Sequence, residues 1–210
     1  NTKKKYITPV IQERWGKENS DNIIMEYYFT DGRVNVDGDK ISRGDKKKAD
    51  YLLLFKDNIP LALVEAKGID HSAMEGYQQV LEYAEILDIP FAYTTNGIDL
   101  IEEDLITHKN NDQLKMQDFP YSEELWNRYI KEKDLTEDEV RLINQPYYID
   151  TSKVKPKKLR YYQRIAINRV IDAIAQGKNR MLLVMATGTG KTFTAFQIVW
   201  RLWKSKTKKK

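Results

Sequence analysis

Two runs of apolar residues lie close together in the first half of the chain and limit its fold more than any other feature. They read YLLLF (51–55) and IPLALVEAK (59–67), and three polar residues separate them. Continuous apolar runs of this length are typical of strands that are covered on both faces of a sheet. The second run nevertheless ends with two opposite charges, Glu65 and Lys67. A buried strand that ends in this way needs an explanation.

A hairpin between the two strands brings a third charged residue to the same place. If the chain turns at Asp57 and Asn58, a common two-residue length, Asp50 lies directly opposite Glu65, with Cβ atoms about 4.5–5.5 Å apart. Side chains alternate along a strand, so Glu65 and Lys67 share one face. A slip of one residue would turn them to the other face. The sequence therefore predicts two carboxylates and an ammonium group at one end of an apolar hairpin.

Carboxylates this close repel each other, and a divalent cation between them would remove the repulsion. The chain has no Cys and two isolated His residues, so we expect carboxylate ligation by Asp50 and Glu65, which suits Mg²⁺ or Mn²⁺. Such an ion would polarise a phosphodiester and help to generate hydroxide from water. Lys67 would orient or deprotonate that water, or stabilise the charge of the transition state. A salt bridge at the surface end of the hairpin is the alternative, and the residues alone leave it open.

The segments around the hairpin predict a layered α/β fold. Thr8 and Pro9 are typical of a helix start, IIMEYYF (23–29) is typical of a strand, and residues 31–48 are expected to form a loop or an irregular hairpin. A further strand, PFAYTTN, is followed by a turn at Asn96-Gly97. Strands on both sides of a helix indicate a mixed sheet flanked by helices.

The helix between these strands has a recognisable start. Ser72 and Glu75 form a capping box, which predicts a helix from Ser72 to about Leu87. Its inward stripe is expected to consist of Met74, Tyr77, Leu81 and Ala84.

The second half of the chain changes character. Short charged helices are expected over SEELWNRYIKEK and TEDEVRLI, and a basic stretch follows at 153–160. We therefore divide the chain into a first domain at 1–119, a helical connector with a basic linker at 120–156, and a last unit at 157–210. The basic stretch and the final KSKTKKK are either solvated faces or phosphate-contacting surfaces for nucleic acid.

The last unit contains a phosphate-binding pattern. An expected strand, MLLVM (181–185), runs into MATGTGKT (185–192), which opens a helix. The loop amides would cradle the β-phosphate of ATP, Lys191 would reach the β- and γ-phosphates, and the Thr192 hydroxyl would ligate Mg²⁺. The residues expected to bind the nucleotide are Thr187, Gly188, Thr189, Gly190, Lys191 and Thr192. Gln163 is expected to contact its adenine base.

This unit is predicted to be incomplete. One buried strand and its following helix leave hydrogen-bonding groups and apolar faces without partners, because a parallel sheet needs neighbouring strands. We expect a fragment cut inside its second domain, which lacks ATPase and translocation activity and binds ATP weakly or not at all.

Asp50, Glu65 and Lys67 resemble the active-site set of a PD-(D/E)xK nuclease, with Ala49 in place of the proline. More widely, KADYLLLF, IPLALVEAKG and QQVLEYAEILDIPFAYTTNG are similar to the amino-terminal region of restriction (R) subunits of type I restriction–modification enzymes. In that family a Gln-x-x-x-Tyr motif follows the active-site strand, which implies that Gln79 and Tyr83 support the nuclease. The resemblance also allows a further acidic metal ligand from an earlier element, Glu13 or Glu26.

The last unit resembles the start of a superfamily 2 helicase motor with a RecA-like fold. Met185 replaces the first Gly of the phosphate-binding pattern, a departure that this superfamily tolerates. LRYYQ (159–163) is similar to its adenine-reading motif, in which Gln163 would contact the adenine edge and Tyr161 or Tyr162 would pack nearby.

Together these resemblances imply the nuclease and motor subunit of an ATP-dependent type I restriction enzyme, a site-specific deoxyribonuclease that cuts double-stranded DNA after translocation. They imply modification (methyltransferase) and specificity subunits as partners, Mg²⁺ or Mn²⁺ at the nuclease, and ATP with Mg²⁺ at the motor. No segment is predicted to span a membrane, and we expect a cytoplasmic protein. Two alternatives stay open: a DNA-translocating ATPase whose nuclease fold only binds DNA or partners, and an ATP-dependent nuclease outside restriction.

Overall fold

A computed structural model of the chain describes residues 2–16, 22–30, 34–37, 40–43, 45–154 and 158–206. The chain forms two compact units, Asn1–Glu132 and Lys133–Lys210. The predicted connector therefore contributes one helix to each unit, and the predicted domain limits stay a prediction. Parts of the predicted basic stretches, 155–157 and 207–210, lie outside the described residues.

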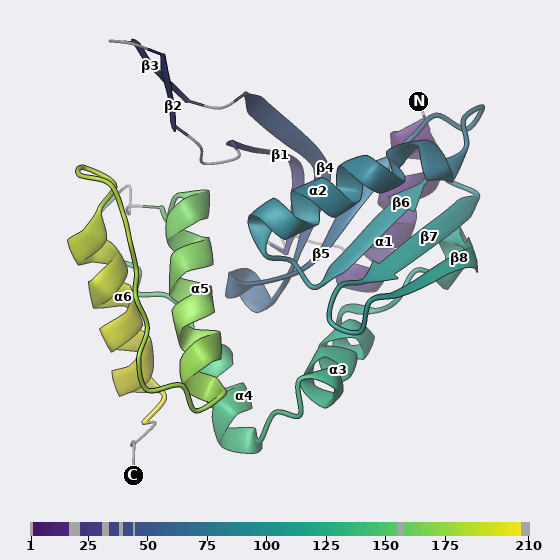
Figure 1. The fold of residues 1–210 in the computed structure, drawn as a ribbon. Helices are drawn as coiled ribbons and strands as arrows, with labels where there is room; N and C mark the ends of the chain where they lie inside the picture. The colour runs from purple at the N-terminus through teal and green to yellow at the C-terminus, as the bar shows by residue number, and fades with distance from the viewer. Residues whose placement is uncertain are drawn as a thin grey trace. The chain divides into compact units, whose positions relative to one another are not determined.

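The first unit is built on a mixed sheet, as predicted, and the sheet has six strands (Figure 1). Its order is β1-β4-β5-β6-β7-β8, in which β5 and β6 are parallel and the other neighbours are antiparallel. The strands are β1 (Ile23–Thr30), β4 (Lys46–Phe55), β5 (Ile59–Ala66), β6 (Phe91–Thr95), β7 (Asp99–Asp104) and β8 (Lys109–Lys115). The irregular hairpin expected within 31–48 is present as β2 (Val34–Asp37) and β3 (Lys40–Arg43).

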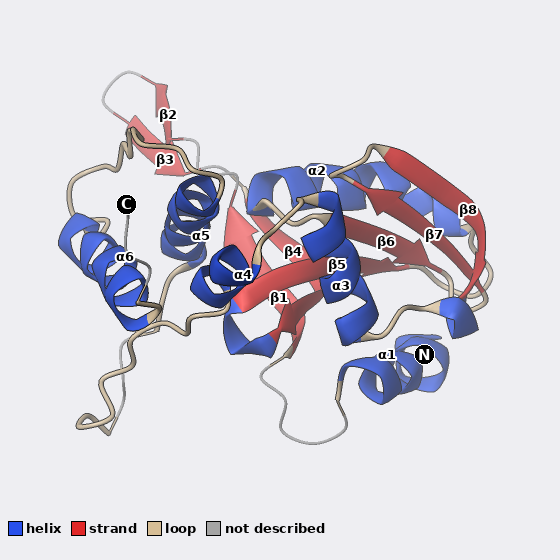
Figure 2. Ribbon diagram, turned by 90° about the horizontal axis from the view of Figure 1, so that it is seen from below, coloured by secondary structure: helices blue, strands red, loops and turns tan. Residues whose placement is uncertain are grey.

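Helices cover both faces of this sheet. Helix α1 (Thr8–Trp15) follows a π-helical turn at Lys3–Ile7 and lies on one face, while α2 (Tyr77–Leu87) lies on the other (Figures 1 and 2). Helix α2 packs on the parallel strands β5 and β6 that it connects. Helix α3 (Ser122–Glu132) completes the unit, and its Trp126 ring stacks on Phe55 of β4 at 4.7 Å between centroids.

The connection between β4 and β5 corrects one prediction. The two-residue turn at Asp57 and Asn58 is wrong, because a 3₁₀ turn at Lys56–Asn58 joins the strands. Next to this turn Leu54 pairs with Pro60, one residue away from the expected register, and a bulge between Leu53 and Leu54 then shifts the register back. Pro60 has no N–H to give to the ladder, and bulges absorb such defects. Tyr51 therefore pairs with Val64 as the predicted register requires.

The predicted stripe of the second helix is confirmed at Ala84, is wrong at Met74, and is only half-buried at Tyr77 and Leu81. Met74 is 48% exposed, and the buried face consists of Ala73, Gly76, Val80, Ala84 and Leu87. The capping box of Ser72 and Glu75 is confirmed, but it caps a 3₁₀ turn at Ala73–Gly76 rather than an α-helix. A 3₁₀ turn has about three residues per turn instead of about 3.6, so the inward phase shifts before α2 begins.

Among its described residues, the second unit contains three helices with long loop segments between them. The helices are α4 (Glu137–Ile143), α5 (Tyr161–Ala175) and α6 (Lys191–Lys204), and α5 packs against both of the others. The predicted strand MLLVM is wrong, since residues 181–185 form no strand and their side chains from Met181 to Val184 are exposed. An extended segment becomes a strand only when a neighbour pairs with it. No helix in the described ranges is long and apolar enough to cross a membrane.

An ion-pair network fastens α3 to β7. Arg128 contacts Glu102 at 2.9 Å and Asp104 at 3.0 Å, and its guanidinium lies over the Phe91 ring. Both carboxylates are largely buried, with side chains 12% and 4% exposed. Burial by itself would lower the pKa of Arg128, but the negative charges of Glu102 and Asp104 outweigh it and raise that pKa.

We expect Arg128→Met to destabilise the first unit by about 3 kcal/mol, because it leaves two buried carboxylates without their counterion. Urea unfolding followed by circular dichroism measures the change. The exposed pair of Lys115 and Asp99 provides the control, since Lys115→Met should have little effect. Equal stability of the two variants would contradict this role for Arg128.

Candidate active site

Asp50 lies where β4 and β5 stop pairing. The paired part of the two strands extends to Tyr51 and Val64. Beyond it, Oδ2 of Asp50 accepts the backbone N–H of Ala66 at 2.9 Å, and Oδ1 forms an ion pair with Nζ of Lys3. The Asp50 side chain is 7% exposed. Its carboxylate thus replaces a main-chain contact between the two strands.

Glu65 is the second buried carboxylate of this site. Its Oε1 lies 3.4 Å from Nζ of Lys67, while its Oε2 is buried and has no hydrogen-bond partner among the described residues. Burial raises the pKa of the Glu65 carboxyl, and the nearby charge of Asp50 adds to the effect. Ionised Glu65 is therefore an incompletely satisfied charge in the native state.

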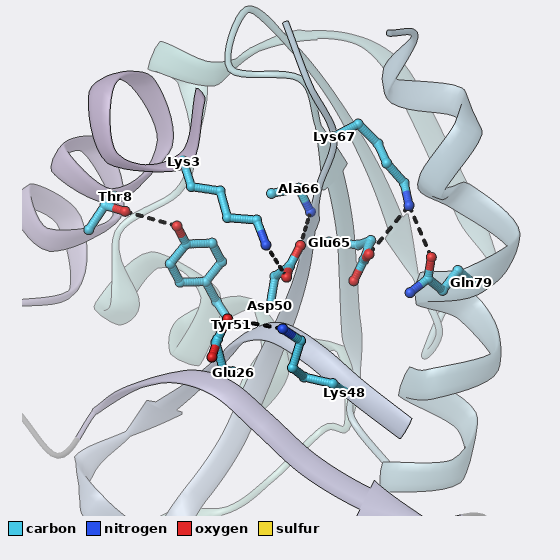
Figure 3. A network of polar contacts seen from close by, with 10 residues as sticks. All are labelled: Lys3, Thr8, Glu26, Lys48, Asp50, Tyr51, Glu65, Ala66, Lys67 and Gln79. Atoms are coloured by element: carbon cyan, nitrogen blue, oxygen red, sulfur yellow. Dashed lines mark hydrogen bonds and ion pairs between the residues drawn. The ribbon is translucent and has the colours of Figure 1, made fainter. Parts of the chain in front are cut away.

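Lys67 is held between a strand and a helix. Its Nζ donates to Oε1 of Gln79, in the first turn of α2, at 3.0 Å. Figure 3 shows Lys67 and Gln79 on one side of Glu65, with Asp50 and Lys3 on the other. The structure therefore brings four of the predicted residues, Asp50, Glu65, Lys67 and Gln79, into one cluster.

Tyr83 contacts other residues. Its ring packs edge-on against Phe29 at 5.0 Å between centroids, and Nζ of Lys47 lies 5.5 Å from the ring centre. The contacts described for Tyr83 are thus with β1 and β4 and not with the carboxylates. A role for Tyr83 stays a prediction.

The two further acidic residues lie in different settings. Glu13 is exposed on α1. Glu26 lies in β1 with a φ of 53° and pairs with Lys48 at 2.9 Å, and this contact lowers the pKa of Glu26 (Figure 3). In the part of the chain that the structure describes, no group of three or more His, Cys, Asp or Glu residues is placed to hold a metal ion. The carboxylates assembled here are therefore Asp50 and Glu65.

Two other residues lie at this site, Lys3 and Gly76, and no sequence pattern predicts either. A Cβ atom on Gly76 would lie 2.4 Å from Oγ1 of Thr94 and 2.8 Å from Cε of Lys67. Thr94 in turn donates to the carbonyl of Ala73 at 2.8 Å. The absence of a side chain at position 76 therefore lets the turn before α2 approach Lys67 closely.

The predicted phosphate-binding loop keeps part of its expected geometry. Gly190, with a φ of 87°, forms the N-cap of α6. Nζ of Lys191 donates to the carbonyls of Met185 and Ala186 at 3.2 and 3.4 Å, and the Thr189 hydroxyl donates to Ala186 at 2.6 Å. The three remaining predicted residues are exposed: Thr187, Gly188 and Thr192.

Gln163 contacts this loop directly. Its Nε2 donates to the carbonyl of Thr189 at 2.8 Å, and its Oε1 accepts the N–H of Arg160 at 3.1 Å. A Cβ atom on Gly190 would lie 2.5 Å from that Nε2. The side chain is buried, and it links the start of α5 to the loop.

Comparison with known proteins adds independent information. Residues 156–210 match the family model described as "Type III restriction enzyme, res subunit". Over 198 residues the chain is 46% identical to the Escherichia coli "Type I restriction enzyme EcoAI endonuclease subunit". The aligned region covers 93% of this chain and 24% of that protein. The chain is 34% identical over 120 residues to the EcoKI endonuclease subunit of E. coli strain K12, covering 54% of this chain and 10% of that protein.

A solved structure is similar along almost the whole chain. It is a fragment of a chain described as an HsdR subunit of a type I restriction enzyme from Vibrio vulnificus YJ016, with a TM-score of 0.81 and 40% identity. The similarity covers 99% of this chain and 38% of that one. By comparison, this chain spans about a quarter of the length of the EcoAI endonuclease subunit.

We expect Gly76→Ala to destabilise the protein by about 1–3 kcal/mol, because the added methyl group overlaps Thr94 and Lys67. The backbone at Gly76 has a φ of −93°, which alanine adopts without strain, so the effect isolates the missing space. Urea unfolding measures it. Gly68→Ala is the control, because its methyl group meets only the exposed ring of His71, and an equal loss in both variants would refute the packing argument.

The raised pKa of Glu65 predicts a pH-dependent stability. Above its unfolded pKa of about 4.3, and increasingly as pH rises through the raised folded pKa, ionised Glu65 destabilises the native state. In the presence of a chelator, Glu65→Gln should therefore be more stable than the wild type at pH 7, and the difference should vanish below about pH 4. Thermal unfolding across this range tests it, with Glu85→Gln, exposed on α2, as the control. A difference that does not change with pH would contradict the assignment.

Proposed function

We propose a function for this chain from one established premise, that it is homologous along nearly its whole length to endonuclease subunits of type I restriction enzymes. The predicted resemblance to restriction (R) subunits of type I enzymes is therefore confirmed, and homology supports a restriction enzyme subunit. We assign its PD-(D/E)xK nuclease site to Asp50, Glu65 and Lys67, which would cut double-stranded DNA with the help of a divalent metal ion. The observation that carries this assignment is the buried, unpartnered Oε2 of Glu65 beside Asp50.

The residues present fit a divalent cation. Glu65 offers a buried oxygen without a hydrogen-bond partner, and Asp50 offers a second carboxylate whose charge acts on Glu65. Oxygen ligands of this kind suit Mg²⁺ or Mn²⁺. When bound, such an ion supplies Lewis-acid stabilisation of a phosphodiester and lowers the pKa of bound water. A module that only binds DNA gains nothing from keeping this buried carboxylate unsatisfied, which favours the nuclease over the alternative.

Lys67 would contact the substrate, and Gln79 would hold Lys67 in position. Of the three N–H groups of a lysine ammonium, one donates to Gln79 and one faces Glu65, so a third is available to a phosphate oxygen or to the attacking water. Gln79 fixes the direction of Lys67, and we propose that it is a positioning residue. The role of the Gln-x-x-x-Tyr motif would then rest on its glutamine.

We further propose that the second unit begins an ATP-dependent motor. The family match over 156–210 supports this, and Lys191 and Thr192 would hold ATP with Mg²⁺. A glutamine amide has two N–H groups and two acceptor lone pairs. Gln163 uses one N–H toward the carbonyl of Thr189 and one lone pair toward the N–H of Arg160. One N–H and one lone pair then remain for the adenine edge.

In the intact enzyme this motor would translocate DNA, and the nuclease would cut it at a distance. Modification (methyltransferase) and specificity subunits would supply site recognition, in the cytoplasm where the DNA lies.

The test uses the intact subunit assembled with its partner subunits on unmodified DNA. Asp50→Asn, Glu65→Gln and Lys67→Met should each reduce cleavage at least about a hundredfold, while ATP hydrolysis persists. Gln79→Ala should reduce cleavage about tenfold, and Gln79→Glu should recover part of it because a glutamate still accepts from Lys67.

Lys191→Ala provides the reciprocal control, since it should abolish ATP hydrolysis. Wild-type cleavage by all three variants at Asp50, Glu65 and Lys67 would refute the nuclease site, and DNA translocation without cleavage by the wild type would support the non-catalytic alternative.

A further inference from the structure

Lys3 reaches the candidate site because the segment that carries it is anchored on both sides. Ile7 and Ile11 are fully buried. The Thr8 hydroxyl hydrogen-bonds to the hydroxyl of Tyr51 at 2.8 Å, and Thr2 Oγ1 accepts the N–H of Ile69 at 3.1 Å. Tyr51 is the strand neighbour of Asp50. The contact of Lys3 with Asp50 is therefore built into the packing of the first helical segment.

Lys3 contacts the oxygen that a metal ion would need. Oδ2 of Asp50 is engaged by the backbone N–H of Ala66, and Oδ1 is the atom that pairs with Nζ of Lys3. The ammonium also acts on Glu65, where its charge lowers the pKa against the effect of burial. A lysine ammonium and a divalent cation repel each other, so both cannot hold Oδ1 at close range.

The two lysines of the site differ in how firmly they are held. Lys67 is 23% exposed and has two partners, Glu65 and Gln79. Lys3 is 38% exposed, and its described ion pair is with Asp50 alone. A long, partly exposed lysine with one carboxylate partner can move into solvent at small cost. Lys3 is thus the member of the site that can leave.

From these contacts we infer that Lys3 is an exchangeable internal counterion of the candidate metal site. In the metal-free protein its ammonium neutralises Asp50, and it leaves Oδ1 when a divalent cation binds. This inference rests on the proposed function, because it requires a metal ion at Asp50 and Glu65. It adds that the first helical segment lowers the affinity of the site for metal.

The test measures Mn²⁺ binding to the intact subunit without nucleotide, by titration calorimetry, so that it does not depend on catalysis. Lys3→Met should bind Mn²⁺ roughly fivefold to tenfold more tightly than the wild type, since the competing ion pair is gone. Lys3→Arg should stay near the wild type because the charge is kept. Lys4→Met is the matched control, since Lys4 is the exposed neighbour and its replacement changes the net charge equally.

A second readout follows the same exchange through stability. Without metal, Lys3→Met should unfold at a lower temperature than Lys4→Met, because Asp50 loses its counterion. Saturating Mn²⁺ should stabilise Lys3→Met more than the wild type, since ligand binding to the native state adds stability in proportion to the logarithm of its affinity.

The outcomes separate the inference from the proposed function. Unchanged or weaker Mn²⁺ binding by Lys3→Met, with binding by the wild type intact, overturns the counterion alone. Equal tightening in Lys4→Met also overturns it, because the effect would then come from net charge. Absence of Mn²⁺ binding in the wild type and every variant overturns both the metal site and the counterion.

Discussion

The burial of carboxylate charge at the end of an apolar strand pair is the constraint around which the first unit is arranged. Asp50 and Glu65 end the most buried part of the sheet, and each is less than a tenth exposed. Charges in such a place need partners. A backbone N–H and Lys3 supply them for Asp50, whereas Glu65 has Lys67 on one oxygen and no described partner on the other. This imbalance is the physical reason to regard the cluster as a binding site and not as a surface salt bridge.

The sequence predicted the position of this cluster better than it predicted the turn that creates it. The apolar runs determined that β4 and β5 pair, and the predicted register holds at Tyr51 although the turn is one residue longer than expected. A bulge compensates for that extra residue, and nothing in the pattern of apolar residues announces a bulge. Lys3 escaped prediction for another reason. It lies 47 residues from Asp50 within a run of three lysines, and only the packed position of the first helix distinguishes one lysine from the others.

The second unit shows the same division between local and non-local information. Two groups within the loop after residue 185, the left-handed Gly190 and the hydroxyl of Thr189, shape it together with the amide of Gln163, which lies 26 residues earlier. Most of these contacts are local, whereas nucleotide binding by the loop stays a prediction. The preceding MLLVM segment depends on strands that pair with it, and the described residues supply none, so its apolar side chains stay exposed. The opposite error occurs at the edge strand β8, where the structure has a strand that the sequence did not predict. Its side chains are mostly exposed and polar, so they form no apolar pattern.

The candidate site combines one lysine that stays in place, Lys67, with one that we propose to be exchangeable, Lys3. This combination resolves a conflict between folding and function. A protein that folds before it meets metal must neutralise Asp50 by itself, yet a strong internal partner would exclude the metal afterwards. Lys3 is the partly exposed member of its pair with Asp50, so it can neutralise the buried carboxylate in the metal-free state and still move into solvent when a metal ion takes its place. Oε2 of Glu65 still has no hydrogen-bond partner among the described residues after folding, so binding of a metal ion would satisfy it. Lys67, held by Gln79, needs no displacement, and it keeps its direction in both states.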